Sequence, residues 1–400
     1  MILVLALAAA DDYATLAKEA ISTAEKVRGL QVKGPIRTEV TGREAIERYV
    51  AERIAKTDAR SSFALTQAAL LAFGLTDEPY DVEGLVRRVA RDQIAGYYDW
   101  EKKTLYVANW IPPYLQKPTL VHEATHALQD QYFGIGRFME PIMGCSEPST
   151  AVASLLEGDA TVAMLDALAG TPVDAPSGEK MVAVIDRLKG ILALASGLGD
   201  VPRVLRESLF FPYLGGVRLV LTARSKGGAE AVNDLYKDPP VSTEQVLHPE
   251  KLFLGQRDTP RDVRFTVPSP GRGLVKVGSD QMGELTLRLV LEETLSAEEA
   301  ARAAEGWDGD RLWAWRRGKE VLALLVSVWD SDTDAVEAEA ALKKTKAPPL
   351  LVERRGAMVL GVWGPKTVDP KPLAEKVWPR VRTTKVRTFG EWRKACARGP

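Results

Sequence analysis

Apolar residues recur every three or four positions through most of the first 255 residues, which is the spacing of helices that bury one face. In TGREAIERYVAERIAKTDA, within residues 12–95, Ile46, Val50 and Ile54 lie four residues apart, and Thr41 is the predicted helix cap. Similar patterns follow near 148–168, 178–197 and 202–225. This part of the chain is therefore predicted to be mostly helical.

Two short runs of β-favouring residues interrupt the helical pattern. They lie at 96–98 and 104–107, on either side of the polar turn DWEKK, and they predict a β-hairpin. Pro118 is predicted to open the next helix, because proline is favoured in a helix's first turn. A hairpin followed by a helix is the local arrangement that we expect here.

The pattern changes near residue 255. Residues 255–275 are rich in Pro, Gly and Arg and are predicted to form a linker. Beyond it, RLWAW, VLALLVSVWD, LLVER and MVLGVWG are typical of strands, and Ser296 with Glu299 predicts a capping box, whereas ELTLRLVLEE fits either a strand or a helix. The predicted fold class is α+β, with a mostly helical domain at 12–255 and a smaller α+β domain at 275–400.

Charge and cysteine content narrow the range of partners. The chain has 53 Lys and Arg against 54 Asp and Glu, so its net charge of −1 gives no field that would attract nucleic acid. The two cysteines, Cys145 and Cys396, are far apart and outside any CxxC pattern. They fit either one disulfide or two buried free thiols.

The chain opens with the apolar run MILVLALAAA, which ends before Asp11. This resembles the apolar core and small-residue cleavage site of a secretory signal without its positively charged start, so residues 1–11 are predicted to be a signal segment. The run is much shorter than the roughly 20 residues that span a bilayer. We expect an exported protein, periplasmic or extracellular, without stable membrane insertion.

The stretch TLVHEATHALQDQYF carries the most specific chemical signal. His122 and His126 lie four residues apart, so one helix face presents both imidazoles to the same ion. Glu123, between them, is placed to accept a proton from a metal-bound water and to pass it to a leaving amine. The alternative is two ordinary helix histidines beside a glutamate. The chain has only three histidines, so chance would rarely produce this spacing, and the motif favours a zinc site.

At these residues the chain resembles the zincin group of metallopeptidases, and His122, Glu123 and His126 match its two ligands and its general base. The metzincin continuation would place glycine at position 129 and histidine at position 132, whereas this chain has Gln129 and Tyr132. The resemblance is therefore to the gluzincin-like zincins, in which a following helix supplies a glutamate as the third ligand.

Glu157, in the apolar pattern ASLLEGDATVAML, is the predicted third zinc ligand. Thermolysin-like gluzincins carry an aspartate four residues later, where this chain has Thr161, so Asp159 or another group would have to orient a histidine ligand. Asp130, one turn beyond His126, is the rival third ligand or an orienting partner, and Asp99 is a weaker rival.

The order GYYD, HExxH-ALQDQ, EGDA, STEQVLHPEK resembles a family of bacterial exported metallopeptidases over about residues 90 to 255. In such enzymes a strand edge lies beside the metal, and TLYVANW is the candidate edge. His248 or Tyr213 is predicted to donate a hydrogen bond to the developing oxyanion, although His248 also fits a turn and Tyr213 also fits the core.

The function expected from these residues is that of a zinc-dependent peptidase. Zn²⁺ bound by His122, His126 and Glu157 would hold a water that Glu123 activates, and the substrate would be a peptide or protein. The alternatives are a degenerate zincin that acts as a binding or scaffold module, and a metal-dependent amidase for a non-peptide amide. An intact Glu123 disfavours the scaffold, because a structural zinc needs no general base. The sequence does not indicate the oligomeric state.

Overall fold

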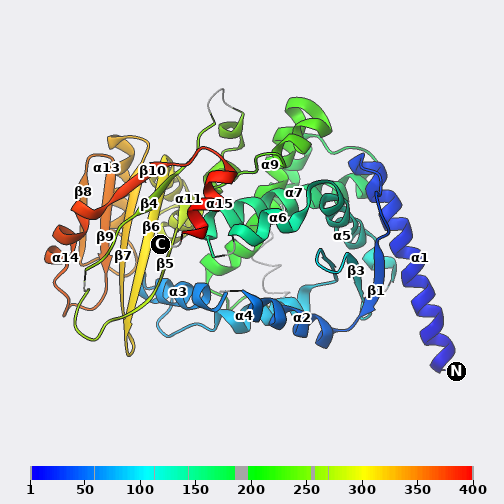
Figure 1. Cartoon of the computed structure of the whole chain (residues 1–400), viewed down its shortest axis with the longest axis horizontal. Coiled ribbons are helices and arrows are strands. Elements are labelled where there is room, and N and C mark those ends of the chain that lie inside the picture. The colour runs from blue at the N-terminus through cyan, green and yellow to red at the C-terminus, as the bar shows by residue number, and fades with distance from the viewer. Residues whose placement is uncertain are drawn as a thin grey trace.

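The computed structural model of the chain describes residues 2–57, 59–111, 113–142, 144–184, 197–253, 257–268 and 270–398. Over these residues the fold is α+β, as predicted, with helices in the centre and a sheet at one end (Figure 1). The larger helices of the first part are α1 (Ile2–Arg28), α2 (Arg43–Lys56), α3 (Ala59–Ala72), α4 (Val82–Gln93), α5 (Pro113–Phe133), α7 (Ser146–Ala169) and α9 (Arg203–Leu235). The shorter ones are α6 (Ile135–Met139), α10 (Thr243–Leu247) and the 3-10 helices η1 (Glu140–Ile142) and η2 (Pro249–Leu252).

The predicted helix over TGREAIERYVAERIAKTDA is confirmed as α2, which buries Ile46 and Ile54. The predicted cap is wrong. Thr41 is the last residue of strand β1 (Arg37–Thr41), where it pairs with Ala108, and Gly42 precedes the helix without a side-chain cap. The pattern at 148–168 is confirmed as α7 and that at 202–225 as α9. Within the predicted helix 178–197, residues 178–184 are helical, and 185–196 lie outside the described residues.

The predicted hairpin is confirmed as the antiparallel strands β2 (Gly96–Asp99) and β3 (Thr104–Ala108). Strand β1 pairs with the other side of β3 in parallel, so the order is β1-β3-β2. The prediction that TLYVANW supplies a strand edge is therefore wrong, since both sides of β3 are paired. The edge that carries predicted site residues is β2.

Helix α5 begins at Pro113, so the prediction that Pro118 opens it is wrong. Pro118 lies about one turn inside, where a missing N–H removes only one early backbone bond. One face of α5 buries Leu120, Ala124 and Leu128 against Ala20 and Ala24 of α1. This packing leaves another face of α5 available to the helices on the opposite side.

Helices α7 and α9 cross in direct backbone contact. A Cβ added at Gly158 of α7 would lie 2.2 Å from the carbonyl carbon of Gly216 in α9. A Cβ added at Gly216 would lie 2.1 Å from the backbone oxygen of Ser154. Only glycine allows this approach, so the pair fixes where these two helices meet, one residue from Glu157.

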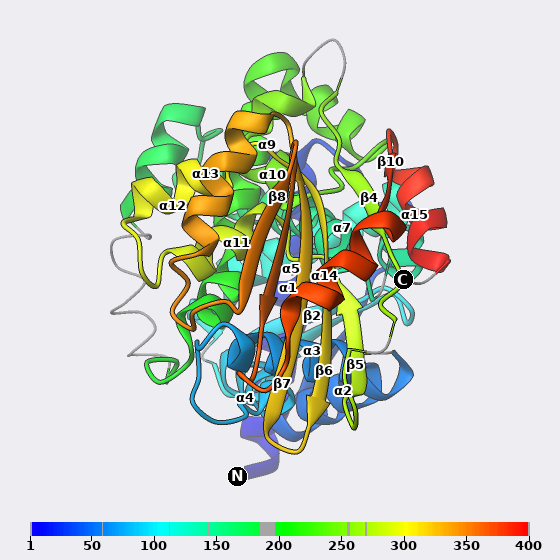
Figure 2. The same ribbon diagram turned by 90° about the vertical axis from the view of Figure 1, so that its left-hand side faces the viewer.

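The C-terminal part is built on an antiparallel five-stranded sheet of order β5-β6-β7-β9-β8 (Figure 2). Its strands are β5 (Val275–Asp280), β6 (Trp307–Arg317), β7 (Glu320–Trp329), β8 (Leu351–Arg355) and β9 (Met358–Trp363). The helices are α11 (Gly283–Leu291), α12 (Ala297–Ala304), α13 (Asp332–Leu342), α14 (Pro370–Val377), η3 (Trp378–Arg380) and α15 (Phe389–Ala397). Strands β4 (Arg261–Arg264) and β10 (Arg382–Lys385) form a separate antiparallel pair.

The strand runs predicted at RLWAW, VLALLVSVWD, LLVER and MVLGVWG are confirmed as β6, β7, β8 and β9. In β7, Leu322 and Leu324 face one hydrophobic cluster, and Ala323 and Leu325 face another. Burial on both faces explains the continuous apolar run in this strand. The capping box of Ser296 is confirmed at α12. ELTLRLVLEE proves to be helical, as α11.

The two parts of the chain share hydrophobic cores. Phe73, just after α3, packs with Trp363 of the sheet, and Trp392 of α15 lies in the cluster around α7 and α9. A disulfide joins Cys145, just before α7, to Cys396 in α15, with 6.0 Å between the Cα atoms. Of the two alternatives for the cysteines, the structure shows the disulfide. Among the described residues, no helix has the length and apolar composition needed to cross a bilayer.

Candidate metal centre

Helices α5 and α7 bring His122, His126 and Glu157 together, and their ligand atoms lie within 4.8 Å of one another. The Nε2 atoms of the two histidines are 3.1 Å apart. Oε2 of Glu157 lies 3.0 Å from Nε2 of His122 and 3.5 Å from Nε2 of His126. Glu157, 35 residues after His122 in sequence, therefore converges with both histidines on one point.

The spacing of these three atoms fits a small tetrahedral cation. Ligands at about 2.0 to 2.1 Å from a tetrahedral zinc ion lie roughly 3.3 Å from one another. The observed separations of 3.0, 3.1 and 3.5 Å surround that value. Two imidazoles and one carboxylate are also a donor set that zinc accepts. The residues present therefore fit the metal that the motif implies.

The electrostatics of the cluster also fit a cation. Burial alone would raise the pKa of Glu157, but His126 and His122 outweigh it and hold that pKa well below its usual range. Burial alone would lower the pKa of His126, but Glu157 outweighs it and raises that pKa to about 9. The carboxylate thus stabilises positive charge at the point where the three side chains meet, which is where a divalent ion would sit.

Glu123 lies beside the cluster and is not one of its three members. Its Oε2 accepts a hydrogen bond of 3.1 Å from the backbone N–H of Tyr98 in β2. Burial raises the pKa of Glu123, and the nearby histidines only partly offset this rise. A carboxylate with a raised pKa that is held by one fixed donor suits proton transfer.

A chain of polar groups orients His126 from behind. Nε2 of Gln129 donates to the backbone oxygen of Leu156 at 3.0 Å and to Oδ2 of Asp159 at 3.1 Å. Its Oε1 is therefore the acceptor for Nδ1 of His126, 2.8 Å away. With the proton on Nδ1, the lone pair of Nε2 points toward the cluster, as a metal ligand requires.

Asp159 is held in turn by two groups outside the motif. Nε of Arg28 in α1 lies 2.7 Å from its Oδ1, and the hydroxyl of Tyr236, just after α9, donates to its Oδ2 at 2.7 Å. Asp159, one of the groups predicted to orient a histidine, lies one link further back, behind Gln129. The signal for Gln129 was its position one turn after His126. No local pattern marks Arg28 or Tyr236.

The rival third ligands lie outside the cluster. Asp130 accepts a hydrogen bond from the hydroxyl of Tyr98 at 2.8 Å and forms an ion pair with Lys103 at 2.6 Å. Asp99 accepts from the backbone N–H groups of Glu101 and Lys102 in the hairpin turn. Both carboxylates therefore contact the hairpin, and Glu157 is the third member of the described cluster.

A cavity of about 300 Å³ opens beside the cluster. It is lined by the three cluster residues, Glu123, residues 96–98 of the edge strand β2, and the aromatic side chains of Tyr49, Trp100 and Tyr213. Tyr97 stacks between Tyr49 and Tyr106, with ring centroids 4.5 and 4.6 Å away. The cavity therefore offers backbone groups on one side and aromatic faces around them.

The structure separates the two predicted oxyanion donors. Tyr213 of α9 lines the cavity, its ring stacks 6.1 Å from that of His122, and Glu157 raises the pKa of its hydroxyl. His248 precedes η2 and bonds through Nε2 to Oε1 of Glu284 at 2.8 Å. His248 does not line the cavity, because the Ser242-capped helix α10 carries it toward α11 instead. This corrects its predicted oxyanion role.

The comparisons with known proteins concern only the C-terminal part. A family model described as "Domain of unknown function (DUF8575)" matches residues 272–388. No curated protein matches the chain. No solved structure matches it either. The matched segment runs from the residues before β5 to those before α15 and does not include His122, His126 or Glu157.

Proposed function

We propose that this protein is a zinc-dependent peptidase of zincin-like type. The observation that carries the proposal is the convergence of His122, His126 and Glu157 within 4.8 Å, with Glu123 beside them as an additional, non-ligand carboxylate. A site that only held a structural metal would need no such carboxylate. The arrangement supports hydrolysis over the alternative of a scaffold.

His122, His126 and Glu157 would hold the metal. When bound, zinc lowers the pKa of a coordinated water to about 7 and polarises a carbonyl group. Glu123 takes one proton from the attacking water and transfers it to the leaving amine as the amide bond breaks. The N–H of Tyr98 holds Oε2 of this carboxylate, so Glu123 keeps its direction through both transfers.

The groups around the cluster fit an extended peptide. Strand β2 has one side paired with β3, and its residues 96–98 line the cavity. A peptide backbone can pair with such an edge as an additional strand. Tyr213, at the cavity surface with 42% of its area exposed, supplies a hydroxyl for the developing oxyanion.

The remaining expectations form part of the same proposal. Residues 12–255 would be the peptidase domain, preceded by a signal segment at 1–11 and followed by an accessory domain at 275–400. The disulfide between Cys145 and Cys396 supports an exported protein, because disulfides persist in oxidising compartments.

The test compares Glu123→Gln with Glu157→Gln. Each variant is assayed for zinc by inductively coupled plasma mass spectrometry and for hydrolysis with a mixed peptide library. Glu123→Gln should keep about one zinc per chain and lose activity by roughly 10² to 10⁴, since only the proton acceptor is removed. Glu157→Gln should lose zinc and activity together, because a neutral amide replaces an anionic ligand.

Asp130→Asn serves as the control. Because Asp130 lies outside the cluster, this variant should keep about as much zinc as the wild-type protein. Wild-type protein with less than a tenth of an equivalent of zinc after reconstitution would refute the metal site. Zinc binding without hydrolysis of any peptide would favour the scaffold module. Hydrolysis confined to non-peptide amides would favour the amidase.

A further inference from the structure

Helix α5 presents two carboxylates to the hairpin on one face. Glu123 and Asp130 are seven residues apart, which places them within about 20° of each other around the helix and roughly 10 Å apart along it. Glu123 lies beside the metal cluster, whereas Asp130 lies outside it. Asp130 is nevertheless buried, with 7% of its area exposed, so its charge needs partners within the protein.

Tyr98 of the edge strand β2 contacts both carboxylates. Its backbone N–H donates to Oε2 of Glu123 at 3.1 Å, and its hydroxyl donates to Oδ2 of Asp130 at 2.8 Å. Tyr98 therefore lies along α5 and joins β2 to this helix at two points. One contact would leave the strand free to pivot about it, whereas two contacts fix both its position and its direction.

Asp130 also holds the turn that follows α5. Its Oδ1 accepts a hydrogen bond of 3.2 Å from the backbone N–H of Ile135, the first residue of α6. Ile135 and Tyr98 both line the cavity beside the metal cluster. One carboxylate therefore connects the edge strand on one wall of this cavity to α6 on another.

Lys103 adds a partner for Asp130 from the hairpin turn. Among the described residues other than glycine, Lys103 alone has a positive φ, of 53°. A side chain makes this conformation costly, and glycine would adopt it more easily. The ammonium group of Lys103 lies 2.6 Å from Oδ2 of Asp130. This ion pair is what a lysine offers at the turn and a glycine does not.

We propose that Tyr98 and Asp130 are positioning residues of the proposed peptidase, on which this inference rests, and that the edge they fix makes the site selective for extended peptides over short ones. Both residues act through β2, whose residues 96–98 line the cavity and whose unpaired side can bind a substrate backbone. An edge that is already ordered binds a peptide without the cost of ordering itself. A peptide too short to reach along the edge gains nothing from it.

The test compares Tyr98→Phe, Asp130→Asn and the double variant with the wild-type protein, all loaded with zinc. The substrates are the longest library peptide that is cleaved well and its shortest truncation that is still cleaved at the same bond. The wild-type protein should prefer the extended peptide by at least about tenfold in kcat/KM.

Each single variant should keep its zinc, while the preference for the extended peptide falls below about threefold because KM rises for that peptide alone. The kcat for both peptides should fall about tenfold, since Glu123 is less well directed. The double variant should be no worse than the more affected single variant, because the two side chains act as one unit.

Hydrogen exchange measures the fixed edge without any hydrolysis. Mass spectrometry of the zinc-loaded protein gives the exchange rate of a fragment that covers β2. In Tyr98→Phe and in Asp130→Asn, these amides should exchange at least about tenfold faster than in the wild-type protein, because local opening of the strand becomes easier.

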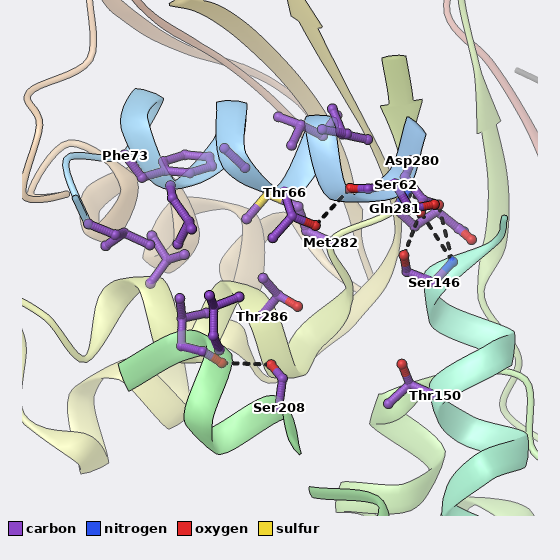
Figure 3. Close-up of a pocket in the computed structure, with 18 residues that line it drawn as sticks. Ser62, Thr66, Phe73, Ser146, Thr150, Ser208, Asp280, Gln281, Met282 and Thr286 are labelled. Atoms are coloured by element: carbon purple, nitrogen blue, oxygen red, sulfur yellow. Dashed lines mark hydrogen bonds between the residues drawn. The ribbon is translucent and has the colours of Figure 1, made fainter. Parts of the chain in front are cut away.

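Ser146→Ala is the matched control, because it also removes a hydroxyl that donates to a buried aspartate. The hydroxyl of Ser146 donates to Asp280 at a second cavity, of about 250 Å³, which residues of α3, α7, α9 and α11 line (Figure 3). This cavity shares no lining residue with the cavity beside the metal cluster. The variant should lose stability but keep both the preference for the extended peptide and the exchange rate of β2.

Unchanged exchange of β2 in both single variants would overturn the proposal, since Tyr98 and Asp130 would then not fix the edge. Faster exchange with an unchanged preference would show that the fixed edge does not select extended peptides. An equal loss of preference in Ser146→Ala would assign the effect to general loosening. Where Tyr98→Phe fails to fold, Asp130→Asn decides alone. A wild-type protein that hydrolyses no peptide would refute the proposed function and the selectivity with it, while the exchange rates would still decide whether the two residues fix β2.

Discussion

Gln129 is the side chain that orients His126 in the candidate metal centre. Its Nε2 donates to Leu156 and Asp159, so its Oε1 must accept from Nδ1 of His126. This fixes both the proton and the ring orientation of the imidazole. Asp159 holds Gln129, and Arg28 and Tyr236 hold Asp159. The loss of zinc affinity caused by a substitution should therefore decrease with each link away from His126.

We predict that Gln129→Met weakens zinc binding by about 10- to 100-fold, because an orienting hydrogen bond to a ligand is lost. Tyr236→Phe removes one of several bonds to Asp159, two links further back, and should cost less than about threefold. Competition with a chromophoric zinc chelator measures both affinities. Equal losses in the two variants would show that the polar chain does not act through Gln129.

At the residue scale, the sequence was informative where the contacts are local. The four-residue spacing of His122 and His126 follows from helix geometry alone, and the structure brings Glu157 to them from the next long helix. His248 could not be placed, because its partner Glu284 lies 36 residues away on a helix whose packing no local pattern specifies. The same limitation hid Arg28, which acts on the centre from α1.

At the scale of elements, the crossing of α7 and α9 determines where Glu157 lies. The contact is backbone to backbone at Gly158 and Gly216. Close packing of this kind has no space for a methyl group, so any larger residue must move one helix. Since Glu157 is the neighbour of Gly158, the helix crossing sets the position of Glu157 in the candidate metal cluster.

We predict that Gly158→Ala destabilises the protein by about 1 to 3 kcal/mol and lowers zinc affinity at the same time. The added Cβ would lie 2.2 Å from backbone atoms of Gly216, which cannot move away as a side chain would. Urea unfolding measures the first effect and chelator competition the second. Gly34→Ala is the matched control, because no atom lies within 4 Å of its added Cβ. An alanine at 158 with full stability and zinc affinity would contradict the linkage.

Whether a segment forms a helix or a strand was easier to predict than which other elements it packs or pairs with. The hairpin and the sheet strands follow from runs of β-favouring residues, and α12 follows from its capping box. The order β1-β3-β2 was not predictable, because the parallel pairing of β1 joins segments separated by α2, α3 and α4. Because β1 pairs with β3, the strand beside the cluster that has an unpaired side is β2 and not β3.

At the scale of the whole molecule, the change of composition at 255–275 marks the change from helices to the sheet but does not separate the hydrophobic cores. Val263, within that range, lies in the cluster formed by α14 and one face of the sheet. Phe73, just after α3, lies on the other face, and Phe389 and Trp392 of α15 pack into the helical core. Periodicity indicates which face of an element is apolar but not which distant element will cover it.

The disulfide strengthens this interlocking. It connects Cys145 to Cys396 across 251 residues of sequence, so breaking it releases a very long loop in the unfolded chain. In the chain-entropy account, cross-links that close long loops are among the most stabilising, typically by about 2 to 4 kcal/mol. Its two ends lie at the start of α7 and in α15. Loss of the disulfide should therefore loosen the attachment of α15 to the helical core.

We predict that the double variant Cys145→Ser, Cys396→Ser loses about 2 to 4 kcal/mol of stability but unfolds in a single transition, because both shared cores keep their members. Zinc affinity should change by less than about twofold, since Glu157 is positioned by the glycine crossing and His126 by Gln129. Calorimetry of both proteins gives the number of transitions, and chelator competition gives the affinity. Two separate transitions would show that the sheet and the helical part unfold as independent domains despite the clusters they share. An unchanged melting temperature would mean that packing of Trp392 alone holds α15 in place.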